Sequence, residues 1–176
     1  MQKTWPNTTI VDDDDNIVGE MQLFDAMAAG KNLRVSHILV ISSQGLMLLQ
    51  QRGPNIMAPN LWNAAAAGHV DAGDTYESTA VKELEEEMGL TTSAEQLNYL
   101  GKIHMPVKSD NGDHAKFHVG YWVQNDGEVH PDPEEVSDYK WVSVEELEAA
   151  ITKNPSDFTE AFVHFAKLYI EQLNSK

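Results

Sequence analysis

The chain contains no cysteine among its 176 residues. This absence excludes disulfide bonds, thiolate zinc sites and a cysteine nucleophile. Small secreted domains often depend on disulfides, so the composition favours the cytoplasm. The N-terminus also lacks the apolar segment of a signal peptide, and no run approaches the roughly 18 apolar residues that span a membrane. We therefore expect a cytoplasmic protein without a membrane partner.

Basic side chains are scarce, because 12 Lys and Arg residues stand against 28 Asp and Glu residues and give a net charge of −16. General nucleic-acid binders hold phosphates with clustered Lys and Arg, so we expect no long nucleic acid as a partner. The same deficit disfavours docking on an anionic membrane. It does not exclude phosphate chemistry, because carboxylates can hold a divalent cation that bridges protein and phosphate.

No repeat, low-complexity tract or long linker divides the chain, and a hydrophobic content of 41% is enough for one packed core. We expect a single domain over residues 1–176, in which residues 1–33 form an N-terminal hairpin and helix extension. The default assembly is an isologous homodimer, because two-fold dimers are the commonest oligomers.

Short apolar runs bounded by turn residues predict strands, and apolar residues at helical spacing predict helices. The predicted strands cover residues 8–11, 17–20, 35–41, 45–50, 65–70, 97–103, 116–123 and 138–142. The predicted helices cover residues 21–28, 75–88, 144–151 and 158–173. Residues 110–112, Asp-Asn-Gly, predict a turn, and the acidic run at 12–16 is interpreted as a solvated turn. This order of elements predicts an α/β or α+β sandwich.

Residues 68–90 hold the richest chemistry of the chain. Asp74 or Thr75 can cap the predicted helix, and Gly89 can end it. Glu83, Glu86 and Glu87 gather on one helical face, because residues three and four apart are neighbours. The composition of the helix alone favours a solvated acidic face. A divalent cation would instead convert the mutual repulsion of the carboxylates into binding, and hard oxygen ligands suit Mg²⁺ or Mn²⁺.

This segment resembles the Nudix box, whose pattern is Gly-x5-Glu-x7-Arg-Glu-U-x-Glu-Glu-x-Gly-U, with U an aliphatic residue. The matching positions are Gly68, Glu83, Leu84, Glu86, Glu87, Gly89 and Leu90. Two positions depart from the pattern, because Asp74 stands for the first Glu and Lys82 stands for the Arg. The similarity extends beyond the box to residues 48–52, Trp62 and residues 141–146.

The resemblance implies an α/β/α sandwich with a mixed sheet. It also implies Mg²⁺-dependent hydrolysis of a nucleoside diphosphate derivative or a related small organic diphosphate. By position, the metal ligands would be Glu83, Glu86, Glu87 and the carbonyl of Gly68, with Mg²⁺ or Mn²⁺ as the cofactor. Lys82 would take the place of the Arg that orients these carboxylates, with its charge but without its fork of donors.

Two assignments stay open at this point. The general base is either Glu83 or Glu135, because some Nudix enzymes take it from the position of Glu83 and others from a loop before a late strand. Glu135 lies in such a loop, where it can equally be an exposed turn acid. Arg52 ends a buried strand and is expected to contact phosphate, with a structural ion pair as the alternative. His69 is the second expected substrate-binding residue.

The N-terminal layout resembles the Nudix branch that contains isopentenyl-diphosphate isomerase. The catalytic cysteine of that enzyme is replaced here by Ala67, and its paired carboxylates are replaced by Lys116 and His118. Isomerase activity is therefore the least favoured alternative. A non-catalytic nucleotide sensor is a further alternative, because Asp74 and Lys82 depart from the pattern. The three retained glutamates favour a hydrolase.

Overall fold

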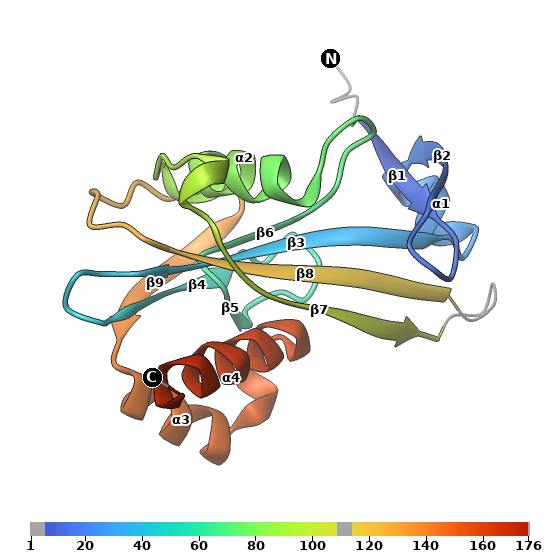
Figure 1. Cartoon of the computed structure of the whole chain (residues 1–176). Helices are drawn as coiled ribbons and strands as arrows, with labels where there is room; N and C mark the ends of the chain where they lie inside the picture. The colour runs from blue at the N-terminus through green and yellow to red at the C-terminus, as the bar shows by residue number, and fades with distance from the viewer. Residues whose placement is uncertain (1–5, 109–113, 176) are drawn as a thin grey trace.

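A computed structural model describes residues 6–108 and 114–175 of the chain (Figure 1). Its strands form one mixed sheet with helices on both faces. The strands are β1 (Asn7–Val11), β2 (Ile17–Gln22), β3 (Asn32–Ile41), β4 (Met47–Arg52), β5 (Trp62–Asn63), β6 (Ala66–His69), β7 (Asn98–Val107), β8 (His114–Gln124) and β9 (Val136–Val142). The α-helices are α1 (Leu23–Ala28), α2 (Tyr76–Met88), α3 (Val144–Lys153) and α4 (Glu160–Asn174). The predicted turn at residues 110–112 lies outside the described residues.

Helix α2 covers one face of the sheet, and α3 and α4 cover the other (Figure 1). Side chains alternate between the two faces along a strand, so β3 contributes to both cores. Ile38 and Val40 pack with Leu84 of α2, while Leu39 packs with Phe162 of α4. The predicted sandwich with a mixed sheet is confirmed. Within the described residues, no helix is long and apolar enough to cross a membrane.

Strand β3 is the centre of the sheet. It runs parallel to β8, with Leu33 opposite Lys116 and Ile41 opposite Gln124, and antiparallel to β4 and β6. Since α2 follows β6 directly, the helix returns across the strand that precedes it. The glycine-containing strand β6 and the acidic helix α2 are thereby brought together.

Most predicted elements are present, with shifted ends. The helix predicted at 21–28 begins only at Leu23, because residues 21 and 22 continue β2 and pair with β1. Strand β5 was not predicted. Thr75 caps α2, and Ser143 caps α3 with a capping box to Glu146. Helix caps can be predicted from neighbouring residues in the sequence, whereas the ends of a strand depend on the strand with which it pairs.

The prediction that the acidic run at 12–16 is a solvated turn is wrong for Asp15, which is buried. Its carboxylate accepts hydrogen bonds from Arg34 Nε at 2.7 Å, from Lys102 Nζ and from the Tyr76 hydroxyl at 3.1 Å. These donors come from β3, β7 and α2, so a single carboxylate fastens the N-terminal hairpin to the rest of the fold. An acidic run in the sequence does not reveal which of its members meets these cations.

We expect Asp15→Asn to destabilise the protein by about 3 kcal/mol at neutral pH, because the part-buried Arg34 charge loses its buried partner and Lys102 loses its ion pair. Burial raises the pKa of the Asp15 carboxyl, but hydrogen bonds from Lys102 and Arg34 outweigh it and hold the pKa below its usual 3.8. This contribution is present above pH 3.8 and is lost as the pH falls through the folded pKa. Urea unfolding at several pH values measures it, with the exposed Asp14→Asn as the control. Equal stability of wild type and Asp15→Asn at pH 7 would contradict the assignment.

Candidate functional site

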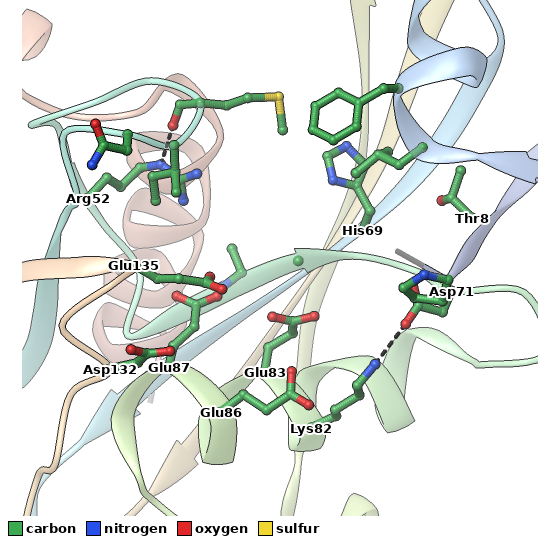
Figure 2. Close-up of a pocket in the computed structure, with 18 residues that line it drawn as sticks. Thr8, Arg52, His69, Asp71, Lys82, Glu83, Glu86, Glu87, Asp132 and Glu135 are labelled. Carbon is green, nitrogen blue, oxygen red and sulfur yellow. Dashed lines mark hydrogen bonds and ion pairs between the residues drawn. The ribbon is translucent and has the colours of Figure 1, made fainter. Parts of the chain in front are cut away.

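A cavity of about 660 Å³ lies beside β6 and α2. It is lined by Pro6, Thr8, Leu23, Phe24, Arg52, Asn55, Ile56, Met57, Ala67, Gly68, His69, Asp71, Lys82, Glu83, Glu86, Glu87, Asp132 and Glu135. Every site residue expected from the sequence is among them. Figure 2 shows Glu83, Glu86 and Glu87 on α2, with Glu135 approaching from the loop before β9.

The loop that carries Glu135 is tied to the end of α2 by backbone hydrogen bonds. The N–H of His130 donates to Met88 O, and the N–H of Asp132 donates to Glu87 O, each at 2.9 Å. On the other side, the N–H of Gly53 donates to Glu135 O at 2.7 Å. These contacts place the Glu135 side chain at the cavity beside Glu87 (Figure 2). Glu135 is therefore positioned by α2 and by the residue that follows β4.

Glu87 is a buried carboxylate that only neutral groups contact directly. Gln50 Nε2 donates to its Oε2, and the N–H of Ala67 donates to its Oε1 at 3.2 Å. Burial raises the pKa of the Glu87 carboxyl, and the hydrogen bonds from Gln50 and Ala67 only partly oppose this. A buried charge without a paired cation is unfavourable, so the folded protein favours either a proton or a metal ion at this position.

Glu83 packs directly against the backbone of Gly68. A Cβ atom at position 68 would overlap the Glu83 carboxylate, so this position accepts only glycine while Glu83 keeps its place. Burial raises the pKa of the Glu83 carboxyl, and the negative charges of Glu87 and Glu86 raise it further. Close contact between β6 and α2 is thus the reason that the sequence has glycine there.

The donor set fits a hard divalent cation. Glu83, Glu86, Glu87 and Glu135 line one cavity, and none forms an ion pair with a Lys or Arg within the described residues. The described Asp, Glu and His side chains do not form a ready-made shell of three or more ligands. Mg²⁺ does not need one, because it keeps several waters and binds through one or two carboxylates together with substrate phosphates.

Lys82 points away from the glutamates that it was expected to orient. Its Nζ donates to Asp71 Oδ2 at 2.7 Å, and this bond raises the pKa of the Lys82 ammonium (Figure 2). Asp71 lies in the segment between β6 and α2, so the pair fastens that segment to the helix. Asp74 does not cap α2, because Thr75 does so. A catalytic role of Lys82 stays a prediction.

Arg52 has no carboxylate partner in an ion pair within the described residues, so the alternative of a structural ion pair receives no support. Its Nε donates to Met57 O at 2.7 Å. Burial lowers the pKa of the guanidinium, while the charges of Glu87 and Glu135 oppose the shift. A part-buried guanidinium at a cavity has donors available for an oxyanion.

His69 faces the side of β6 opposite to Glu83. Successive residues of a strand point to opposite faces, and Gly68 faces Glu83. Burial lowers the pKa of the His69 imidazole to about 3, helped by the charges of Lys116, His118 and Arg52, so the ring is neutral at physiological pH. Its buried Nε2 has no hydrogen-bond partner within the described part of the chain. The nitrogen is thus an unsatisfied polar atom buried beside the cavity.

Several cavity residues were missed by reasoning from the sequence. Gln50 is fully buried, and a polar residue inside an apolar strand was the available signal. Asp132 was visible as a member of the 131–136 loop. The apolar part of the wall comes from two separate segments, residues 23–24 and 56–57, and no local pattern connects them.

A model of the NUDIX domain matches residues 30–162 of the chain. The curated relatives include an isopentenyl-diphosphate Delta-isomerase of Serratia proteamaculans, which is 30% identical over 90% of this chain and 88% of its own length. A prenyl-diphosphate phosphatase of Methanosarcina mazei is 29% identical over 86% of this chain and 87% of its own length.

The fold recurs in solved structures. A protein of Deinococcus radiodurans has a TM-score of 0.73 at 20% identity, over 93% of this chain and 99% of its own. An Ap4A hydrolase of C. elegans has a TM-score of 0.58 at 20% identity, over 82% of this chain and 99% of its own. At this identity the likeness establishes the fold, including the arrangement of the sheet between α2 and the pair α3 and α4.

Proposed function

The chain belongs to the NUDIX domain family, and we propose that it uses Mg²⁺ or Mn²⁺ to hydrolyse the diphosphate linkage of a small organic diphosphate. Within this class, we propose a substrate whose organic part is apolar, such as a prenyl group, in preference to a nucleoside. The family match and the acidic cavity support a Nudix-type diphosphate hydrolase.

The proposal rests on a cavity that has both an acidic part and an apolar part. Carboxylates without cation partners and Arg52 line one part of it, and Leu23, Phe24, Ile56 and Met57 line another. Phe24 is 59% exposed and Met57 is 40% exposed, and apolar side chains left open in a cavity are suited to an apolar ligand. The relatives named for isopentenyl and prenyl diphosphates support the same substrate class.

A bound divalent cation would polarise the phosphoryl oxygens and neutralise the charge that develops on them. Glu83, Glu86 and Glu87 would hold it, and Arg52 would contact phosphate oxygens. Glu83 or Glu135 would accept the proton of the attacking water. The water oxygen forms a bond to one phosphorus while the P–O bond of the bridging oxygen breaks. The products are the organic monophosphate and orthophosphate.

Hydrolysis of geranyl diphosphate, isopentenyl diphosphate and ADP-ribose tests the proposal, with MgCl₂ or MnCl₂ present. Orthophosphate release reports on the two prenyl substrates, and formation of AMP and ribose 5-phosphate reports on ADP-ribose. We expect metal-dependent release from the prenyl substrates and a lower kcat/KM for ADP-ribose. No turnover of any of the three would contradict hydrolysis. Nucleotide binding without turnover would support the sensor alternative. Deuterium uptake into isopentenyl diphosphate in D₂O would support the isomerase alternative, which Ala67, Lys116 and His118 disfavour.

We expect Phe24→Ser to raise the KM for geranyl diphosphate about tenfold, because the loss of apolar contact amounts to about 1.4 kcal/mol. The KM for the shorter isopentenyl diphosphate should change less, and kcat should change little. Ile17→Ser is the matched control, because Ile17 is an exposed apolar residue that does not line this cavity. Equal KM values for wild type and Phe24→Ser would contradict the role of the apolar wall.

A further inference from the structure

Lys116 of β8 is a part-buried cation without a counter-charge. Its ammonium forms no hydrogen bond or ion pair within the described residues. The other part-buried cations have recorded partners. Arg34 pairs with Asp15, and Lys82 pairs with Asp71. Arg52 lies near Glu87 and Glu135, and the ammonium of Lys140 lies over the Trp62 ring at 3.8 Å. Among the described residues, Lys116 differs from them in having neither a carboxylate nor an aromatic ring against its ammonium.

The surroundings of Lys116 disfavour its charge. Burial lowers the pKa of the ammonium, and the positive charge of Arg52 lowers it further. A part-buried ammonium without a paired anion is unfavourable, and a group with such a perturbed pKa in a cavity is a candidate for a functional site. The structure thus points to an anion that belongs next to Lys116.

A second cavity of about 550 Å³ lies at this lysine. Its polar lining is mostly basic and consists of Lys108, His114, Lys116 and His118, with Glu160 as the carboxylate. Glu160 is exposed at the first turn of α4 and forms no ion pair within the described residues. The rest of the lining is apolar. Such a basic lining is unusual in a protein whose net charge is −16.

His118 supplies a second donor to this cavity. Its Nδ1 lies 2.8 Å from Nε2 of His37, and the buried Nδ1 of His37 has no partner within the described residues. We assign the proton of His37 to Nε2, because a proton on the buried Nδ1 would have no acceptor. His37 then donates to His118, so the proton of His118 lies on Nε2. This N–H makes no hydrogen bond in the described structure.

The two cavities lie on either side of Val35 of β3. Val35 is paired with His69 of β6 on one side and with His118 of β8 on the other, so the two imidazoles lie on the same face of the sheet. His69 lines the cavity of the glutamates, and His118 lines the second cavity. Helix α1 contributes to both, through residues 23–24 and through Met27. An anion at Lys116 would therefore lie next to the hydrolytic site.

We propose that Lys116 and His118 form an anion-binding subsite for a phosphate-type oxyanion. The oxyanion is either a phosphate group of the bound substrate or free phosphate, which hydrolysis releases nearby. The ammonium of Lys116 supplies the charge, and the Nε2–H of His118 supplies a directed hydrogen bond. The binding of free phosphate does not depend on the proposed function, whereas binding of a substrate phosphate rests on it.

Calorimetric titration of the metal-free protein with inorganic phosphate tests the subsite. We expect wild type to bind phosphate, and Lys116→Met to weaken binding at least about tenfold, because a charge-assisted hydrogen bond is lost. Lys116→Arg should retain most of the affinity. Lys167→Met is the matched control, since Lys167 is exposed on α4 and lines neither cavity, and it should bind like wild type. No binding to wild type, or equal binding to Lys116→Met, would overturn the proposal.

Steady-state kinetics separate the two sources of the oxyanion. If the substrate phosphate occupies the subsite, Lys116→Met raises KM for the diphosphate with little change in kcat. If free phosphate occupies it, KM stays constant and product inhibition by phosphate weakens. Unchanged KM and unchanged inhibition would overturn the proposal. If no diphosphate is turned over but Lys116→Met still loses phosphate binding, the proposed function fails and the subsite stands.

Thermal unfolding distinguishes a binding role of Lys116 from a structural one. Removal of an uncompensated buried charge should leave the midpoint of Lys116→Met equal to that of wild type or above it. Phosphate should raise the midpoint of wild type more than that of the variant. A variant that is less stable than wild type without phosphate would show that Lys116 supports the fold, which would contradict the proposal.

Discussion

Hydrolysis by the Glu87→Gln variant is expected to be about a thousandfold slower than by wild type, because the change removes a charge that no other group at this buried position can replace. The fold should persist. Glutamine has the shape of glutamate, and the Oε1 of Gln50, which has no partner within the described residues, can accept the new N–H after an amide flip. The measurement is kcat/KM with Mg²⁺, together with a circular dichroism spectrum.

The same variant should remove the pH dependence of stability that the Glu87 carboxyl contributes. Burial raises the pKa of the Glu87 carboxyl, so the folded protein holds a proton there that the unfolded chain releases above the usual pKa of 4.5. This contribution to stability is present below pH 4.5 and declines as the pH rises toward the folded pKa. In EDTA, Glu87→Gln should therefore be more stable than wild type at pH 8 and equally stable near pH 4.5. Added Mg²⁺ should stabilise wild type at pH 8 and should affect the variant less.

Glu85→Gln is the matched control for Glu87→Gln, because it makes the same change on the same helix at an exposed position outside the cavity. We expect it to keep wild-type kcat/KM and wild-type stability in EDTA. If both variants lose activity equally, the effect reflects the overall charge of α2. The assignment of Glu87 to the metal site would then be wrong.

The second large effect is expected for Gly68→Ala. The added methyl group would overlap the Glu83 carboxylate, so Glu83 or β6 must move. Displacement of a ligand by an ångström is enough to cost about a hundredfold in rate. We expect kcat/KM to fall at least that much and Mn²⁺ affinity to fall with it, as measured by the electron paramagnetic resonance of free Mn²⁺.

Gly19→Ala is the control for Gly68→Ala. A Cβ atom at Gly19 would meet no atom within 4 Å, and Gly19 lies on β2 outside the cavity. This variant should bind Mn²⁺ and turn over substrate like wild type. Wild-type Mn²⁺ affinity in Gly68→Ala would contradict the packing of Glu83 against β6.

The grouping of Glu83, Glu86 and Glu87 was predictable because it depends only on helical periodicity. The capping of α3 by Ser143 was predictable for a similar reason, since cap and partner lie three residues apart. Such features are local, so the spacing of residues determines them before any tertiary contact forms.

Features that depend on tertiary contacts were not predictable in the same way. Asp15 belongs to an acidic run, yet it is buried because Arg34 and Lys102 from two other strands reach it. Lys82 stands at the position of the Arg in the Nudix box, but its ammonium binds Asp71 and not the glutamates. The apolar wall likewise joins segments that are more than 30 residues apart in the chain. In each case the deciding partner lies beyond the three- and four-residue spacings that helical periodicity determines.

Phosphorus NMR of geranyl diphosphate with the wild-type protein, before and after addition of MgCl₂, tests the central claim most directly. We predict that the two diphosphate resonances persist without metal and are replaced by those of geranyl monophosphate and orthophosphate once Mg²⁺ is added. Under the same conditions Glu87→Gln should leave the diphosphate resonances in place. Unchanged diphosphate resonances with wild type and Mg²⁺, or equal turnover by wild type and Glu87→Gln, would contradict the claim.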